Sequence, residues 1–251
     1  MEINTIFNED CLKGMERLPN ESIDAIICDL PYGTTACSWD TILPFDELWE
    51  QYRRLIKKDG AIVLFGAEPF STALRASNLK EYKYDWYWVK NTATGFAFAK
   101  KQPMRSVETI SVFSKGTPRY YPQGLVPIRN PQVKTRRNPD KSDIYHSESL
   151  AMKGYIQEFS GYPNNVLKFN KESKHCFHPT QKPVELLEYL IRSYTNKNDL
   201  VLDNCMGSGT TAIAAINTER RYIGFEMNES YYKNSLKRIE QNTTQLSLFN
   251  E

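Results

Sequence analysis

The amino-acid sequence predicts an α/β protein whose core is a doubly wound, largely parallel sheet. Strand and helix patterns alternate from the N-terminus to about residue 116, and the same alternation returns after residue 177. Alternation of this kind is typical of βαβ units, which build parallel sheets with helices on both faces. About 60 residues between the two regions lack clear periodicity, and this length indicates an inserted, irregular module rather than a connection.

Each predicted element depends on a local pattern. Short apolar runs bounded by Gly, Pro or acidic residues predict strands, and apolar residues at helical spacing predict helices. The predicted strands are 22–29, 61–66, 84–91, 108–116, 200–203 and 221–226. The predicted helices are 43–60, closed by Gly60, then 183–194, 208–217 and 229–242. We expect residues 243–251 to form a frayed tail or a small docking segment.

Composition is that of an ordinary globular protein. The 251 residues, with 40% hydrophobic content, are enough for a large core. The five cysteines show no paired spacing, and no apolar run is long enough to cross a bilayer, so we expect a cytoplasmic protein without membrane contact. We expect residues 1–116 and 177–251 to be the two halves of the sheet domain, and 117–176 to be the insertion.

Charge alone does not identify a partner, because the formal net charge is only +2. The distribution is more informative, since basic residues cluster in polar, tyrosine-rich segments. The clustered residues are Lys100, Lys101, Arg105, Arg129, Lys134, Arg136 and Arg137. Such clusters are compatible with a nucleic-acid backbone and equally with a solvated surface.

A glycine turn follows the predicted strand at 200–203, in the stretch "VLDNCMGSGTT". Gly207 and Gly209 would let a ligand approach the backbone, and the helix that opens at Thr210 would supply free N–H groups, with Asp203 at the strand end. About twenty residues later a second strand ends on Glu226, where dinucleotide-type folds place an acid on ribose hydroxyls. The turn lacks a third glycine and a P-loop lysine, so it favours a nucleoside with a zwitterionic tail over a pyrophosphate.

An earlier strand ends on Asp29, Leu30, Pro31 and Tyr32, in the stretch "DAIICDLPYG". This order resembles the Asp-Pro-Pro-Tyr motif of the S-adenosylmethionine-dependent DNA amino-methyltransferases. The resemblance implies that the Asp29 carboxylate and the Leu30 carbonyl accept hydrogens from an exocyclic amino group, while Tyr32 stacks on the flipped base. Pro31 restricts the residue before it to extended geometry, which would aim that carbonyl.

Two further segments resemble motifs of the same family. The segment "NEDCLKGMERLPNESIDAI" puts Asp10, with Cys11 beside it, in the cofactor site, and the family's acid there contacts the adenine. The segment "HPTQKPVELLEYLI" resembles the final motif and would supply Thr180 and Lys182 at the methionine end. The catalytic motif precedes the insertion and the glycine motif follows it, which is the permuted order of the β group. The resemblance therefore implies a Rossmann-like methyltransferase sheet carrying a target-recognition insertion.

The sequence departs from the family pattern at two places. Leu30 stands where a first proline is usual, which keeps the carbonyl but relaxes the turn. Asn204 and Cys205 replace a proline and an aromatic residue that would pack beside the cofactor and the target base. These replacements affect the wall of the pocket and leave the glycine turn intact.

The predicted function is a site-specific methyltransferase that acts on the N6 amino group of adenine in double-stranded DNA. An acid at the first motif position accompanies adenine more often in the resembling family, and cytosine-N4 enzymes more often carry serine there. Cytosine-N4 methylation, methylation of RNA or of a protein amide, and a catalytically dead DNA-binding regulator are the alternatives. Further candidate partners are a second copy of the chain and a cognate restriction endonuclease, and the basic residues Lys100, Lys101, Arg105, Arg136 and Arg137 are the expected DNA contacts.

Other residues have simpler interpretations. His175, Cys176 and His178 lack a second ligand pair, so we expect no metal. The alternating Trp86 and Trp88 (with Tyr87 between them) predict packing within a sheet. Phe96, in a polar loop, is compatible both with contact to a flipped base and with core packing.

Overall fold

The computed structural model describes residues 2–33, 40–134, 155–170 and 181–249. The chain forms two compact units, one made of Met1–Tyr121 with Asn165–Glu251 and the other of Pro122–Asn164. Within the described residues, the larger unit contains an eight-stranded sheet and six α-helices, and the smaller one a two-stranded sheet. All residues that line the cavity described below belong to the larger unit.

The main sheet has the strand order β1-β10-β9-β2-β3-β5-β4-β8. Every neighbouring pair is parallel except β3 with β5 and β5 with β4, so only β5 runs against the others. This largely parallel sheet confirms the predicted α/β class. Its strands are β1 (Thr5–Phe7), β2 (Ile23–Cys28), β3 (Ile56–Gly66), β4 (Tyr82–Thr94), β5 (Arg105–Phe113), β8 (Val166–Lys168), β9 (Leu200–Asp203) and β10 (Arg221–Phe225).

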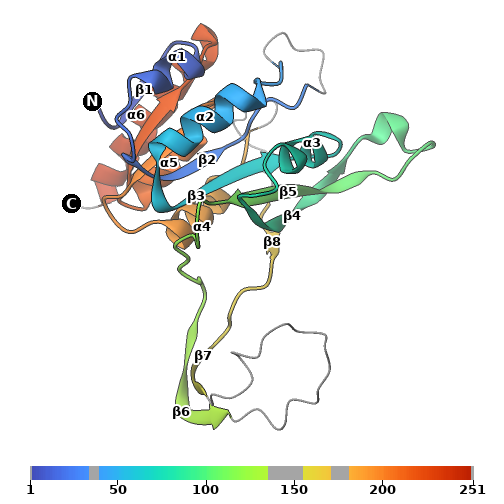
Figure 1. The fold of residues 1–251 in the computed structure, drawn as a ribbon, viewed down its shortest axis with the longest axis vertical. Helices are drawn as coiled ribbons and strands as arrows, with labels where there is room; N and C mark the ends of the chain where they lie inside the picture. Colours follow the sequence, from blue (N-terminus) through green and yellow to red (C-terminus); the bar gives the residue numbers. More distant parts are fainter. Residues whose placement is uncertain (1, 34–39, 135–154, 171–180, 250–251) are drawn as a thin grey trace. The chain divides into compact units, whose positions relative to one another are not determined.

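Helices cover both faces of this sheet (Figure 1). One apolar cluster joins the sheet to α1 (Cys11–Glu16), α2 (Phe45–Leu55) and α3 (Phe70–Ser77). The other cluster joins the opposite face to α4 (Val184–Tyr194), α5 (Thr210–Asn217) and α6 (Glu229–Phe249). A short 3₁₀ helix, η1 (Phe96–Phe98), lies between β4 and β5. Among the described residues no helix has the length and apolar content that a bilayer crossing requires.

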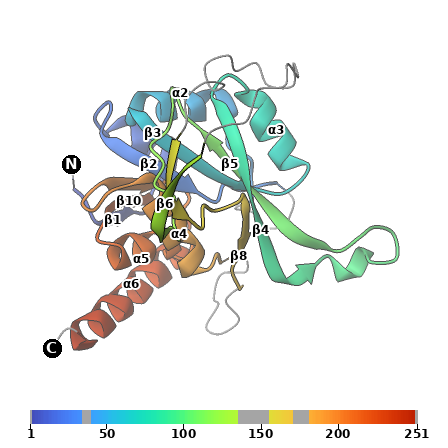
Figure 2. The same ribbon diagram turned by 90° about the horizontal axis from the view of Figure 1, so that it is seen from below.

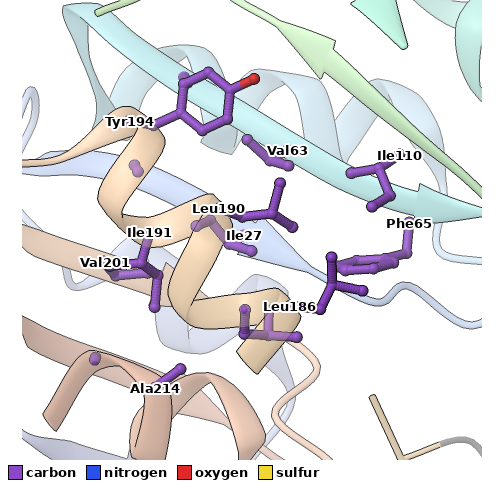
Figure 3. Close-up of a cluster of buried hydrophobic side chains, with 14 of the residues drawn as sticks. Ile27, Val63, Phe65, Ile110, Leu186, Leu190, Ile191, Tyr194, Val201 and Ala214 are labelled. Carbon is purple, nitrogen blue, oxygen red and sulfur yellow. The ribbon is translucent and has the colours of Figure 1, made fainter. Parts of the chain in front are cut away.

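Helix α4 is fixed by apolar packing against the centre of the sheet. Figure 3 shows Leu186, Leu190 and Ile191 of this helix beside Ile27 and Val63, and all five side chains are almost fully buried. Burial of such side chains stabilises a fold by roughly 1.5–3 kcal/mol each. Because the segment before α4 carries Lys182, this packing also fixes the place of that residue.

The strand order reverses direction between β9 and β2. From β2 the chain continues through α2 to β3 on one side, and from β9 it continues through α5 to β10 on the other. The two central strands are parallel, with Ala25 opposite Val201. Ligands of open α/β sheets bind at the carboxyl ends of the strands at such a switch point.

The helix predicted at 43–60 is too long at its C-terminal end. Helix α2 ends at Leu55, and β3 already begins at Ile56, which lies opposite Ile23 of β2. Gly60 therefore does not end a helix. It lies within the strand, where a Cβ atom would stand 2.7 Å from the carbonyl oxygen of Asp24, so the close approach of two strands requires glycine.

The expectation of a frayed tail after residue 242 is wrong for the described residues. Helix α6 continues to Phe249. The hydroxyl groups of Thr243 and Thr244 donate to the carbonyls of Ile239 and Glu240, both at 2.9 Å, which is the back-bonded arrangement of threonine within a helix.

The described part of the smaller unit is more regular than the sequence indicates. Strands β6 (Val126–Lys134) and β7 (Tyr155–Ser160) form an antiparallel pair whose register shifts between Pro127 and Gln132. Prolines in β6 hide its alternation from a periodicity argument. The unit spans Pro122–Asn164, which is narrower than the predicted insertion at 117–176, because residues 117–121 and β8 group with the larger unit.

Candidate active site

One cavity of about 520 Å³ opens at the carboxyl ends of the central parallel strands. This volume lies in the range of roughly 300–1,000 Å³ that is typical of small-molecule sites. Residues from the ends of β2, β9 and β10 line it because parallel strands present their carboxyl ends at one edge of the sheet. The predicted site residues in its lining are Asp10, Cys11, Asp29, Leu30, Pro31, Tyr32, Lys182, Asp203, Gly207, Thr210 and Glu226.

Asp29 follows the last residue of β2, and its carboxylate is held from two sides. The Tyr32 hydroxyl donates to Oδ1 at 2.6 Å, and the Lys182 ammonium donates to Oδ2 at 2.5 Å. The side chain is 24% exposed. Burial raises the pKa of Asp29 above its usual range, and the positive charge of Lys182 opposes this shift. The carboxylate is therefore held in one orientation at the cavity by a hydrogen bond from Tyr32 and an ion pair with Lys182.

The aromatic ring of Tyr32 has one supported face. It stacks on Phe70 of α3 with ring centroids 5.0 Å apart and an interplanar angle of 25°. Tyr32 also lines the cavity, whose wall it shares with Pro31. The ring is thus held in one orientation, which is what a stacking platform for a planar ligand requires.

Lys182 belongs to a row of alternating charges that sequence reasoning missed. Its ammonium lies 3.4 Å from Oε2 of Glu108 on β5, and Oε1 of Glu108 accepts from Lys90 on β4 at 3.1 Å. Burial lowers the pKa of Lys182, but the charges of Asp29 and Glu108 outweigh burial and raise it above its usual value. The sequence-based prediction put Lys182 only at the cofactor, whereas here it contacts the catalytic candidate.

The glycine turn after β9 is organised by Asp203. Its carboxylate accepts from the backbone N–H of Cys205 at 3.0 Å and from the Thr211 hydroxyl at 2.6 Å. Burial raises the pKa of Asp203 to about 6. Gly209 has φ +78° and a Cβ there would meet Ser235 at 3.0 Å, so the turn needs glycine at this position. Gly209 supports the turn from behind and is not part of the cavity lining.

Glu226 is held by backbone groups at the rim of the same cavity. Its two oxygens accept from the N–H groups of Gly207 and Asn228, both at 2.8 Å. Burial raises the pKa of this carboxyl, and the two N–H donors oppose the shift. A carboxylate offers about four acceptor positions, so two remain for a ligand's hydroxyl groups.

The unusual residues Asn204 and Cys205 form a polar wall beside the turn. The Tyr52 hydroxyl donates to Oδ1 of Asn204 at 2.5 Å, and the amide nitrogen of Asn204 lies 3.7 Å from the sulfur of Cys11. Asn204 is 2% exposed, so its hydrogen bonds replace the packing that a proline would give. The hydrogen bond with Cys205 and, next to it, burial raise the pKa of the Cys11 thiol, so this thiol stays protonated.

The remaining predicted residues lie elsewhere. Lys100, Lys101 and Arg105 are exposed in and beside the β4–β5 turn, outside the cavity lining. Thr180, Arg136, Arg137 and the His175–His178 segment lie outside the described residues. Phe96 is 81% exposed, so the core-packing interpretation is wrong, whereas Trp86 and Trp88 are buried in the sheet. Within the described ranges no group of His, Cys, Asp or Glu side chains could hold a metal ion.

The cavity fits a nucleoside with a charged amino-acid tail. Glu226 has free acceptor positions for ribose hydroxyls, and the turn at Gly207 brings backbone close to a ligand. Asp10, the N-cap of α1, accepts from the Lys13 N–H at 3.1 Å through Oδ1 and also lines the cavity. Glu226, Asp10 and Asp29 line the same cavity, so a bound nucleoside and a second ligand at Asp29 can meet within it.

This fold and site agree with a class of enzyme, the S-adenosylmethionine-dependent methyltransferases. The family described as DNA methylase, the N6/N4 methyltransferases, matches residues 23–237. The chain belongs to this family and is an S-adenosylmethionine-dependent DNA amino-methyltransferase.

Individual relatives cover nearly the whole chain. The type II methyltransferase M1.MboII of Moraxella bovis is 30% identical, over 92% of this chain and 94% of the relative. The DNA adenine methyltransferase YhdJ of Escherichia coli K12 is 29% identical, over 95% of this chain and 83% of the relative.

Solved structures agree with the fold. The M1.HpyAVI–SAM complex has a TM-score of 0.62 and 25% identity, and the alignment covers 93% of this chain and 98% of that one. The cytosine-N4-specific PvuII DNA methyltransferase has a TM-score of 0.65 and 20% identity, covering 96% of this chain and 90% of that one, and supports the fold alone.

The position of Glu226 yields a first testable prediction. Glu226→Ala should weaken binding of S-adenosylmethionine by about 1–3 kcal/mol, because the ribose hydroxyl groups would lose a buried acceptor. Turnover at saturating cofactor should fall much less. Isothermal titration calorimetry measures the change, with Glu229→Ala, an exposed acid on α6, as the control. An unchanged dissociation constant would remove Glu226 from the cofactor site.

Proposed function

We propose that this enzyme methylates the N6 amino group of adenine in duplex DNA. The observation that carries the proposal is the Asp29 carboxylate, fixed at the cavity by Tyr32 and Lys182. An acid at this position accompanies adenine more often than cytosine in the family. A relative named as a DNA adenine methyltransferase supports the same choice.

The chain's own residues account for most of the chemistry by positioning. An exocyclic amino nitrogen is a weak nucleophile because its lone pair is delocalised into the ring. The Asp29 carboxylate would accept a hydrogen bond from one N–H of the amino group, and the Leu30 carbonyl a hydrogen bond from the other, which directs the lone pair toward the methyl group. S-adenosylmethionine supplies that methyl group when bound. Tyr32, backed by Phe70, would hold the flipped base by stacking.

The remaining assignments of the site complete the proposal. Asp10, Cys11, Asp203, Gly207, Gly209, Thr210 and Glu226 would form the cofactor site, joined by Thr180 from outside the described ranges. The unit at 122–164 and its flanks would recognise the target sequence, with Arg136 and Arg137 on phosphates. The type II relatives support a role in restriction and modification beside a cognate endonuclease.

Nucleoside analysis tests the target atom. DNA from cells that express the protein is digested to nucleosides, and mass spectrometry compares it with DNA from cells expressing Asp29→Asn. We expect N6-methyladenine in the first sample only. Enrichment of N4-methylcytosine instead would assign the enzyme to the other branch of the same family. Sequencing that detects modified bases then gives the recognition sequence.

A further inference from the structure

An arm with basic and aromatic residues projects from the larger unit between β4 and β5. It comprises residues 91–107, and in both ribbon views it extends beyond the rest of that unit (Figures 1 and 2). Most of its side chains are exposed. Phe96 is 81% exposed, Phe98 56% and Met104 39%, so three large apolar side chains are open to solvent on one short turn. Grouped apolar exposure of this kind marks a contact surface.

The charge of the arm has one sign. It contains Lys100, Lys101 and Arg105, and no Asp or Glu occurs between residues 91 and 107. None of the three cations forms an ion pair with another described residue. A surface that combines unpaired cations with open aromatic rings complements a nucleic acid, whose phosphates attract the cations and whose bases stack on the rings.

The base of the arm adjoins the active site. Lys90 and Glu108 immediately flank the arm, and Glu108 lies 3.4 Å from Lys182, which binds Asp29. At about 3.3 Å per residue, the seven or eight residues on each side allow a reach of roughly 25 Å from that point. A two-stranded ribbon of this kind fits the major groove of B-DNA. The arm therefore starts where a target base would be bound and is long enough to follow the duplex beside it.

We propose that this arm contacts the duplex beside the target base, with its cations on phosphates and with Phe96 and Phe98 against bases. The proposal rests on the proposed DNA substrate and adds a second contact surface to it. Apolar side chains inserted at a base step can hold open the gap that a flipped base leaves. A second copy of the chain is the competing occupant of the same apolar tip.

Salt dependence tests the cations. The probe is a 30-base-pair duplex carrying the sequence found methylated in expressing cells. The double variant Lys100→Ala/Lys101→Ala should bind it more weakly, and the slope of log affinity against log salt should fall by roughly 2, since each phosphate contact contributes about 0.9. The matched control is Lys58→Ala/Lys80→Ala, two exposed lysines outside the arm. Equal slopes in both variants would overturn the phosphate contacts.

Fluorescence tests the aromatic tip. Tryptophan in Phe96→Trp should be quenched by the same duplex, because an indole that stacks on bases loses emission, while Leu79→Trp should not respond. Leu79 is 68% exposed and precedes the opposite end of β4. A signal that instead follows protein concentration without DNA would assign the tip to a second copy and overturn the proposal. If the parent enzyme methylates DNA and the lysine and Phe96→Trp variants show no effect of the arm on DNA binding, the proposal for the arm is refuted and the proposed function stands. If the parent enzyme itself transfers no methyl group to DNA, the proposed function is refuted.

The row of charges beneath the arm carries a separate inference. Lys90, Glu108 and Lys182 come from β4, β5 and the segment before α4, and their exposed side-chain fractions are 6%, 16% and 8%. Buried charges are retained only when they are paired. No other described acid binds Lys182 besides Asp29 and Glu108. We infer that Glu108 and Lys90 are positioning residues that hold Lys182 against Asp29.

The charged and titratable groups around Asp29 define the expected pH dependence. They are Tyr32 and Cys28 on its own segment, Lys182 before α4, Glu108 on β5 and Asp203 on β9. If methyl transfer needs ionised Asp29, the rate falls as the pH drops through the raised pKa of this carboxyl. Removing the neighbouring negative charge of Glu108 lowers that pKa, and removing the positive charge of Lys182 raises it.

Single-turnover rates across pH test this inference. Glu108→Gln should reduce the plateau rate roughly 10-fold to 100-fold through misplacement of Asp29, and should move the acid limb to lower pH. Lys182→Met should move that limb to higher pH. Lys182→Arg keeps the positive charge and should leave the limb in place, and it serves as the second variant if Lys182→Met does not fold. The control is Glu81→Gln, an acid of 12% exposure paired with Arg53 elsewhere. If the acid limb of the pH–rate profile coincides with that of the parent enzyme in all variants, the role of Glu108 is structural only.

Discussion

Asp29→Asn should reduce the rate of methyl transfer about 10³-fold while leaving cofactor affinity nearly unchanged. The substitution keeps the size of the side chain but removes the negative charge that faces the amino group, and it can present an NH₂ where an acceptor is needed. Losing one preorganised electrostatic partner of a transition state costs about 10²–10³-fold in rate. We expect the larger value, because Asp29 also receives the hydrogen bonds of Tyr32 and Lys182. Transfer of labelled methyl groups to duplex DNA measures the loss.

Cofactor binding separates this role from a structural one. Calorimetry with S-adenosylmethionine should give the parent affinity for Asp29→Asn, because the cofactor contacts are proposed at Glu226 and the glycine turn. Asp46→Asn, an exposed acid at the start of α2, is the matched control and should alter neither quantity. If Asp29→Asn also lost the cofactor, the carboxylate would belong to the cofactor site and not to the target amino group.

The meeting of the two motifs could be predicted because it follows from topology. Asp29 and Asp203 are 174 residues apart (203 − 29), yet each lies at the carboxyl end of a parallel strand, and β2 and β9 are neighbours. Alternating strands and helices predict parallel strands, and parallel strands gather their ends at one edge. The glycine turn and Glu226 follow from the same argument, since β10 is next to β9.

The charges beneath the site could not be predicted in this way. Lys90 and Glu108 lie on β4 and β5, the two strands of an antiparallel hairpin, so their approach depends on hairpin register and not on strand order. In β4 and β5 they resemble ordinary solvent-facing residues of alternating strands. A weak signal existed in the sequence, because Lys90 and Glu108 each stand beside strongly apolar runs, but nothing in the local sequence connects them with Lys182.

The predicted ends of α2 and α6 were wrong because the local sequence at each was compatible with two structures. The polar run after Leu55 suited a helix end closed by glycine, yet Ile56 pairs with Ile23 of β2 and Ala61 with Ala25, and burial against a sheet outweighs helix propensity at so short an end. The C-terminal threonines suited a tail, yet their hydroxyl groups bond to the helix itself. In both cases the deciding contact is with residues that a short window does not contain.

Two substitutions at Tyr32 should differ strongly, and the difference tells which part of the side chain matters. Tyr32→Phe removes the hydroxyl that donates to Asp29 at 2.6 Å but keeps the ring on Phe70. Because Lys182 still holds the carboxylate, we expect roughly a tenfold loss of rate. Tyr32→Ala also removes the stacking surface for the flipped base, which is worth about 1–3 kcal/mol per base, so its total loss should be roughly 50-fold to 1,500-fold.

The two losses should also respond differently to the DNA. A duplex with a mismatch at the target base costs less to open, so it should restore part of the activity of Tyr32→Ala, whose defect is in holding the flipped base. It should restore little in Tyr32→Phe, whose defect lies at Asp29. Tyr84→Phe removes a hydroxyl bonded to Tyr194 on the other side of the sheet and serves as the control. The two variants could instead lose the same activity and show no recovery on the mismatched duplex. The hydroxyl group alone would then account for the role of Tyr32, and the flipped base would stack elsewhere.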